Sequence, residues 1–251
     1  MKKIQHPYQI SSSDKRDDIR ILPFVKNGVE YNYCFVLLNP FYKRKQRFNN
    51  FQKEKPNWIE GSKSEILNDY DKYYWTDFIN QSGISDIKEI FHCLYVSDHN
   101  YIERFQKVKK QVWEAFKKII NENQLISSSD SHISILLINE ILAALIKMGY
   151  DSLALYDIFD ENFEFTKTSK LIESEIEFPS EFRLLTNDRK LLFYQEYEHY
   201  ETFIYSTDLK LLEYFLELTE VEGFFANHRT TLLWSEIEYE ENDKILSIKE
   251  D

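Results

Sequence analysis

Glycine is scarce in this chain, and its scarcity restricts the ligand-binding folds that the chain can form. The 251 residues include five glycines, at positions 28, 61, 83, 149 and 223. Loops that cradle phosphates need closely spaced glycines, because bare backbone N–H groups must approach the ligand and some residues must adopt a positive φ. No two of the five are near enough, so a P-loop, a Rossmann dinucleotide fingerprint and the Gly-x-Ser-x-Gly elbow of α/β-hydrolases are all absent.

The cysteines and the apolar runs indicate a cytoplasmic protein without a membrane span. Cys34 and Cys93 are too few and too far apart for a disulfide framework, which favours a reducing compartment. The longest apolar run, residues 133–148, is interrupted by polar residues and is shorter than the roughly 18 residues of a membrane span. The N-terminus lacks the apolar region of a secretory signal. Neither a Cys-x-x-Cys pair nor a His-Glu-x-x-His motif occurs, and we expect no metal and no cofactor.

The composition is that of a folded protein. Hydrophobic residues make up 43% of the chain and aromatic residues 16%, which argues against disorder. At this length the chain can bury a sizeable core without disulfides or metals. We expect a single domain over residues 1–251. It has a possible subdivision into a mainly helical part, residues 1–150, and a part made of an antiparallel sheet and a helix, residues 151–251.

Strand-forming patterns occur in both parts. Residues 31–38 are rich in aromatic and β-branched side chains, and Gly28 before them suggests a hairpin. Residues 150–158 are a second candidate strand. After residue 182, three short apolar runs separated by turns indicate a meander, and Thr230–Trp234 is typical of a last strand.

Helical patterns dominate the middle of the chain and return near its end. Apolar residues at a spacing of three to four predict helices over residues 64–82, 87–94, 102–120 and 133–148. Ser206-Thr207-Asp208 then caps a helix that runs to about Val221, and Gly223 ends it. We therefore predict an α+β fold, in which the meander and the last strand form an antiparallel sheet packed against several helices. Strands 31–38 and 153–158 are expected to join this sheet, and the long helices to cover one of its faces.

Charge is distributed unevenly along the chain, whose net charge is −12. Residues 1–60 hold 12 Lys and Arg against 6 Asp and Glu, a net charge of +6. Residues 161–251 hold 9 against 22, a net charge of −13. Such asymmetry indicates either two partners of opposite charge or two halves that attract one another. Net charge steers association and keeps a protein soluble, but it does not define a site.

A basic segment from Phe41 to Phe51 interleaves cations with aromatic residues. Nucleic-acid binders use this mixture, because cations neutralise phosphates while rings stack on bases. The alternative is a surface loop whose rings point inward and whose cations are solvated or paired with the acidic C-terminal part. The net charge of −12 repels phosphates, so we do not expect nucleic acid as a partner.

Two further clusters contain residues that could bind a metal or perform acid–base chemistry. His92 and Cys93 lie near His99, and a thiolate beside an imidazole is the start of a nucleophilic pair. Adjacent helical positions point about 100° apart, however, so a buried structural cysteine and a surface histidine are the simpler interpretation. The segment Glu196–Glu201 contains three carboxylates and His199, but on an extended backbone at most two of them converge, as in a solvated hairpin tip.

The connection from Gly223 to Trp234 combines apolar anchors with Asn227, His228 and Arg229. Loops held by rigid elements often carry function, and an Arg with a His could bind an anionic ligand by charge-assisted hydrogen bonds. The alternative is a helix-to-strand crossover whose aromatic residues belong to the core. Asn227, His228 and Arg229 are our candidates for a small-molecule site.

Several segments resemble a bacterial family that is known only as a domain of unknown function. They are Val36–Phe41, Phe182–Arg189, Gly223–Ala226 and Thr230–Trp234. The resemblance implies a soluble bacterial protein and brings no activity, cofactor or catalytic residue with it. The order of elements after Phe182 also looks like that of the cytoplasmic immunity proteins that neutralise bacterial toxins. That likeness lies only in the order of strands, turns and helix, and a shared fold does not establish a shared function.

Two hypotheses of function follow. The first is a cytoplasmic interaction protein, immunity-like or regulatory, that presents an acidic, aromatic surface to a basic protein partner. Its natural anchors are tyrosines, which supply contact area at a small entropic cost: Tyr194, Tyr197, Tyr200 and Tyr205. The second is an enzyme that acts on a small anionic substrate near Asn227, His228 and Arg229. No recognisable catalytic constellation favours an enzyme, so we prefer the first hypothesis and leave the oligomeric state open.

Overall fold

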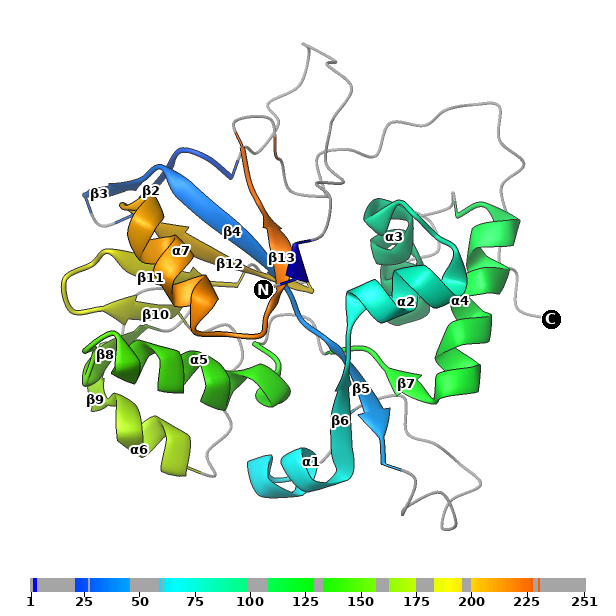
Figure 1. Cartoon of the computed structure of the whole chain (residues 1–251), viewed down its shortest axis with the longest axis horizontal. Helices are drawn as coiled ribbons and strands as arrows, with labels where there is room; N and C mark the ends of the chain where they lie inside the picture. Colours follow the sequence, from blue (N-terminus) through cyan, green and yellow to red (C-terminus); the bar gives the residue numbers. More distant parts are fainter. Residues whose placement is uncertain are drawn as a thin grey trace.

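The computed structural model describes residues 2–3, 21–26, 28–45, 59, 61–98, 108–128, 133–156, 163–174, 183–195, 200–227 and 230, without the side chains at positions 2, 3, 95, 96, 98 and 163. Within these residues, eight strands form one main sheet (Figure 1). Their spatial order is β1 (Lys2–Lys3), β13 (Glu222–Phe225), β4 (Tyr33–Leu38), β12 (Glu201–Ser206), β11 (Leu191–Tyr194), β10 (Arg183–Thr186), β8 (Ser152–Tyr156) and β9 (Phe163–Lys167). Neighbouring strands are antiparallel except β1 and β13, which are parallel. The predicted α+β fold with an antiparallel sheet is therefore confirmed. Of the predicted strands, residues 33–38 and 153–156 belong to this sheet, Tyr31 lies in a strand of a separate hairpin, and residues 157–158 are outside the described part of the chain.

The central strand β4 is apolar on both faces. The side chains of Cys34, Val36 and Leu38 alternate with those of Phe35 and Leu37, and all five are buried. Successive residues of a strand point to opposite faces of the sheet. Both faces therefore need a cover, as is typical of strands that lie inside a layered fold.

Three helices cover the face that carries Phe35 and Leu37. They are α5 (Ile135–Lys147), α6 (Thr168–Glu173) and α7 (Leu209–Glu217). Phe215 of α7 is fully buried and meets Phe193 of β11 edge to face, with ring centroids 5.3 Å apart. A buried side chain of this size stabilises the fold by roughly 1.5–3 kcal/mol. Among the helices that the structure describes, none has both the length and the apolar character to cross a membrane.

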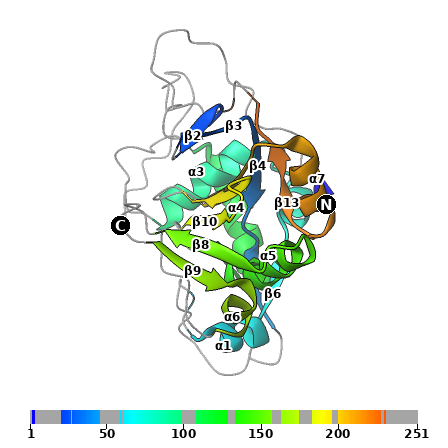
Figure 2. The same ribbon diagram turned by 90° about the vertical axis from the view of Figure 1, so that its left-hand side faces the viewer.

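A second group of elements covers the opposite face. It consists of α2 (Trp75–Ser82), α3 (Ile87–Asp98), α4 (Lys110–Asn123) and the hairpin of β2 (Phe24–Lys26) and β3 (Val29–Tyr31). Trp75 and Phe91 of these helices lie in one hydrophobic cluster with Val36 and Phe203 of the sheet. The three helices lie at the end of the molecule away from β8 and β9, which are nearest the viewer in Figure 2. The expectation that helices cover a single face was wrong, because β4 carries apolar side chains on both faces and every residue of the neighbouring β12 is buried.

The hydrophobic cluster on this second face contains residues from both 1–150 and 151–251. The assignment of one domain to residues 1–251 stays a prediction. Among the described residues, β6 (Tyr70–Tyr73), β5 (Phe41–Arg44) and β7 (Leu125–Ile126) form a smaller sheet in that order, and α1 (Lys63–Asp69) directly precedes β6. We expected one helix over residues 64–82, but β6 interrupts it. Tyr70 and Tyr73 instead pair with β5, which is nearly thirty residues away in the sequence.

Helix α7 ends earlier than the sequence suggested. The carboxylate of Asp208 accepts a hydrogen bond from the backbone N–H of Lys210 at 2.9 Å, and so caps the helix as predicted. The helix ends at Glu217, however, and Gly223 lies in β13 instead of ending the helix. A Cβ atom at position 223 would lie 2.0 Å from the carbonyl oxygen of Val36, so the close approach of β13 to β4 requires glycine. Of the predicted last strand, residues 230–234, the structure describes Thr230 alone.

Candidate functional site

The tyrosines that we expected on the surface lie in the core. Tyr194, Tyr200 and Tyr205 are 9%, 1% and 2% exposed. Their side chains lie on the face covered by the hairpin β2–β3 and by α2–α4. These three residues therefore cannot serve as exposed anchors. They are buried because the hairpin and the three helices cover this face of the sheet. Tyr197 lies outside the described residues, and its role stays a prediction.

Only one of the three residues proposed for a small-molecule site is described. Asn227 is exposed, and its backbone N–H donates to the hydroxyl of Thr230 at 3.0 Å. The N–H of Thr230 in turn donates to the carbonyl of Asn227 at 3.0 Å, which makes a short turn. His228 and Arg229 lie outside the described residues, so a site near Asn227 stays a prediction.

His92 and Cys93 do not have the electrostatics of a nucleophilic pair. Burial raises the pKa of the Cys93 thiol above its ordinary range, and the charge of Glu89 adds to the shift. Burial lowers the pKa of His92 to about 4, with a smaller contribution from Lys88. A reactive pair needs the opposite shifts, a thiolate and an imidazolium. Cys34 is also a buried free thiol, and burial raises its pKa as well.

Two candidate segments from the sequence remain, residues 41–51 and residues 196–201. Most of their described residues pack within the fold. In the segment 41–51, Phe41 and Tyr42 are buried in β5, Lys43 lies over the ring of Tyr73, and Arg44 lies over the ring of Tyr70. Residues 46–51 are outside the described part of the chain.

In the segment 196–201, the described residues are Tyr200 and Glu201, and both are buried. No group of three His, Cys, Asp or Glu side chains among the described residues could hold a metal ion. Neither segment is therefore a candidate site where the structure describes it.

The outer side of α7 forms an acidic and aromatic surface, which we call the acidic face: Glu213, Tyr214 and Glu217. All three residues are exposed, and the Tyr214 side chain is 47% exposed. Glu213 and Glu217 are one helical turn apart, and neither carboxylate forms an ion pair with another described residue. Like charges at this spacing destabilise a helix by about 0.2–0.5 kcal/mol.

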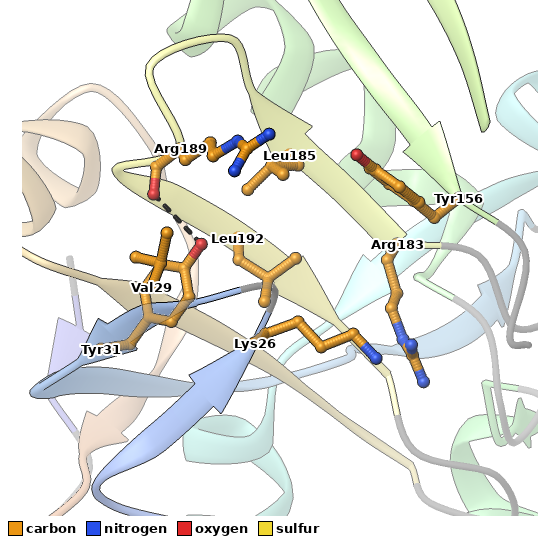
Figure 3. A pocket seen from close by; sticks show the side chains of 8 residues that line it. All are labelled: Lys26, Val29, Tyr31, Tyr156, Arg183, Leu185, Arg189 and Leu192. Carbon is orange, nitrogen blue, oxygen red and sulfur yellow. Dashed lines mark hydrogen bonds between the residues drawn. The ribbon is translucent and has the colours of Figure 1, made fainter. Parts of the chain in front are cut away.

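A small cleft lies between the hairpin β2–β3 and the strands β8, β10 and β11 (Figure 3). The space between its walls, open solvent included, is about 280 Å³. It is lined by Lys26, Val29, Tyr31, Tyr156, Arg183, Leu185, Arg189 and Leu192. The cleft thus combines three cationic side chains and two tyrosines with apolar side chains.

Alternation along the hairpin brings its side chains to the cleft. Phe24 and Lys26 are partly buried, whereas Val25 between them is 63% exposed. Phe24 stacks on Tyr205 of β12, with ring centroids 4.3 Å apart, and this contact holds one face of the hairpin against the sheet. Lys26 pairs in register with Val29, so both side chains reach the cleft from that face.

The turn between β10 and β11 supplies Arg189. Its backbone N–H donates to the carbonyl of Thr186 at 2.8 Å, and its φ of 58° lies in the left-handed region that favours glycine. A residue with a Cβ adopts this conformation at a cost of about 1–2 kcal/mol. The hydroxyl of Tyr31 donates to the carbonyl of Arg189 at 3.1 Å, which ties the hairpin to the turn (Figure 3).

Two further groups define the electrostatics of the cleft. The guanidinium carbon of Arg183 lies 4.4 Å from the ring centroid of Tyr194, and Nη2 donates to the Tyr194 hydroxyl at 3.4 Å. The cation–π contact orients this cation at the cleft. Burial raises the pKa of Tyr31 to about 12, although the charge of Arg189 opposes the shift. The Tyr31 hydroxyl therefore stays a donor at neutral pH.

Sequence reasoning did not find the residues of the cleft. The apolar run and the turn that begin the meander after residue 182 were predicted, as was the hairpin near Gly28. Each of the three cations, however, is an ordinary Lys or Arg next to a turn or a strand end. What distinguishes them is that the sheet brings together residues as far apart as 26 and 189, and no local signal carries that information.

The fold and these surfaces define an α+β protein with an antiparallel sheet covered on both faces. The chain matches the family described as "Protein of unknown function (DUF2711)" over residues 17–236, and it therefore belongs to that family. No curated protein and no solved structure matches the chain. The resemblance to a domain of unknown function is thereby confirmed, and the family brings no activity with it.

Proposed function

We propose that the protein is a cytoplasmic interaction protein, immunity-like or regulatory, that binds a basic protein partner through the acidic face of α7. The observation that carries the proposal is the exposed Tyr214 between two carboxylates that have no ion pair with any described residue. A tyrosine gives contact area with little loss of side-chain entropy, and the flanking charges select a cationic surface.

Charge complementarity supports this choice of partner. The net charge of −12 attracts basic proteins over a long range and raises their rate of association at low salt. Glu213 and Glu217 then act at short range, where one exposed ion pair contributes about 0.2–1 kcal/mol. A lysine or arginine placed between the two carboxylates would also remove their mutual repulsion. The buried free thiols of Cys34 and Cys93 are consistent with a reducing compartment.

Site-specific photo-crosslinking tests the proposal. A photo-reactive phenylalanine replaces Tyr214 in the full chain, and the protein is irradiated in a lysate of its source organism at low and at high salt. The matched position is Phe165 of β9, which is 62% exposed and lies at the far edge of the sheet. We expect a basic protein to be crosslinked at position 214, at low salt, and not at position 165.

Charge reversal provides the second half of this experiment. Glu213→Lys with Glu217→Lys reverses the acidic face, and Glu114→Lys with Glu122→Lys on α4 changes the net charge equally at another exposed place. The first pair should abolish the crosslink at position 214, and the second pair should leave it. If no basic protein is crosslinked there, or if both pairs act alike, α7 is not the binding surface.

A further inference from the structure

We propose that the outer edge of β9 binds β9 of a second copy of this chain, so that two main sheets join into one antiparallel sheet. The outer edge is the side of Phe163–Lys167 that faces away from β8. This surface is separate from the acidic face of α7 and does not depend on it. A photo-reactive group at position 165 would accordingly link two copies of the chain and not a basic protein.

The main sheet ends in two very different edges. At one end, β1 consists of Lys2 and Lys3 alone and offers little backbone for pairing. At the other end, all five residues of β9 pair with β8, and no other described strand lies on the outer side of β9 (Figure 1). Alternate residues of an edge strand direct their N–H and C=O groups outward, where they can pair with another chain. The register of β9 is uninterrupted and residues 163–167 include no proline, so neither a bulge nor a proline protects this edge.

Phe165 places an aromatic ring at the middle of this edge. Its side chain is 62% exposed, more than that of any other described aromatic residue. In register it lies opposite Ala154 of β8, whose methyl group is too small to cover a phenyl ring. The helices α2–α4, which cover this face of the sheet elsewhere, lie at the other end of the molecule (Figure 2). A second copy that pairs with β9 would bury the ring, and burial of apolar surface favours association.

The sequence of β9 suits pairing with itself. An antiparallel pair of identical strands has a two-fold axis, and pairing about the middle of residues 163–167 uses all five of them. Phe165 then faces its own copy at the axis, and Glu164 lies opposite Thr166 of the second copy. Within one strand the Thr166 hydroxyl already donates to the Glu164 carboxylate at 3.1 Å, so these two side chains are compatible neighbours. No two like charges lie directly opposite each other in this register.

The charge around β9 explains why two copies can meet there. Each chain carries a net charge of −12, so two copies repel each other at long range. Residues 163–173, which form β9 and α6, hold two carboxylates and two lysines, and all four are exposed: Glu164, Lys167, Lys170 and Glu173. This segment is therefore neutral, in contrast to the acidic face of α7. The acidic face attracts a basic partner, whereas the balanced charge at β9 permits contact with a second acidic copy.

Sedimentation of the full chain over a range of concentrations, at a salt concentration that screens the net charge, tests the proposal. We expect a reversible dimer. Phe165→Lys places two like charges at the axis and should weaken dimerisation about ten-fold or more. Val25→Lys makes the same change in charge at a residue of the hairpin β2–β3 that is 63% exposed, and should weaken it less than about two-fold. A monomer at all concentrations, or equal effects of the two variants, overturns the proposal.

Engineered cysteines test the register. At the axis of an antiparallel pair, the Cα atoms of the two copies of residue 165 lie about 4.5–5.5 Å apart, which is within the range of a disulfide. Under mild oxidation Phe165→Cys should therefore link two copies of the chain, whereas the native thiols of Cys34 and Cys93 are buried and should not. Glu164→Cys is the control, because the two copies of residue 164 are offset along the strands and lie more than about 7 Å apart. Equal linkage at both positions would mean random collision, and the paired edge would be refuted.

Discussion

The replacement Gly223→Ala tests the packing of β13 against β4, on which one side of the main sheet depends. An ideal Cβ at position 223 lies 2.0 Å from the backbone oxygen of Val36 and 2.7 Å from a ring carbon of Phe35. Cβ contacts below 3.0 Å essentially do not occur, so the strands must separate by about 1 Å. Such a shift breaks the backbone ladder that joins residues 223–225 to residues 35–37.

The size of the effect follows from these contacts. Overpacking a well-filled site costs about 1–3 kcal/mol, and each lost ladder hydrogen bond costs about 1 kcal/mol. Glu222 is also displaced, and its carboxylate accepts the backbone N–H of Thr76 at 3.2 Å at the start of α2. We therefore expect the free energy of unfolding to fall by about 3–4 kcal/mol.

Gly28→Ala is the control for this experiment. Gly28 has a φ of +75°, but no atom lies within 4 Å of its ideal Cβ. That variant should lose only the conformational preference of glycine, about 1 kcal/mol. Urea unfolding followed by the fluorescence of the tryptophans, of which Trp75 is 2% exposed, measures both variants. If Gly223→Ala is no more destabilising than Gly28→Ala, β13 does not pack against β4 as described.

Three further predictions concern single side chains. Because the pKa of His92 falls from 6.5 in the unfolded chain to about 4 in the fold, the unfolded state binds its proton more tightly. The stability contributed by neutral His92 is complete above about pH 6.5 and is lost as the pH falls towards 4, by at most about 3 kcal/mol. Arg189→Gly should leave the free energy of unfolding unchanged or raise it by up to about 1 kcal/mol, since the left-handed φ favours glycine. Asp208→Ala should lower it by about 1 kcal/mol through loss of the cap on α7.

Each of these predictions has its own measurement and control. For His92, urea midpoints between pH 7 and pH 4 are compared with those of His92→Gln, and parallel pH profiles would contradict the shift in pKa. For Arg189→Gly, thermal unfolding decides, and a loss of more than 1 kcal/mol would mean that the side chain holds the turn. For Asp208, the asparagine variant retains a capping oxygen and should cost less than alanine.

The elements that sequence analysis predicted correctly depend on signals within a few residues. Gly83 ends α2 in the left-handed conformation that its position after an apolar stripe indicates. Asp208 starts α7 because its carboxylate reaches an N–H two residues away. The turn after Thr186 and the hairpin around Gly28 are local in the same sense.

The errors concern residues whose environment comes from distant segments. Tyr70 and Tyr73 have a helical spacing, but pairing with β5 makes them part of a strand. Phe203 and Tyr205 alternate along β12 with Thr202, Ile204 and Ser206, and all six residues of the strand are buried, so no pattern in β12 distinguishes a surface side from a buried one. Pairing with a distant strand makes Tyr70 and Tyr73 part of a sheet. The layer of helices and the hairpin on the second face of the main sheet bury the tyrosines at β12.

The amino-acid sequence by itself determined the class of fold, the caps and turns, and the absence of glycine-rich phosphate loops, because these depend on backbone preferences and on neighbours within one or two turns. Only the tertiary structure decided which tyrosines are buried, which carboxylates of α7 have no ion pair with another described residue, and which cations line the cleft. Lys26 and Arg189 are 163 positions apart, and strand pairing across the whole sheet brings them to one cleft. Burial and electrostatic interactions depend on the distances between side chains, and for residues far apart in the sequence those distances are set when the strands pair into the sheet.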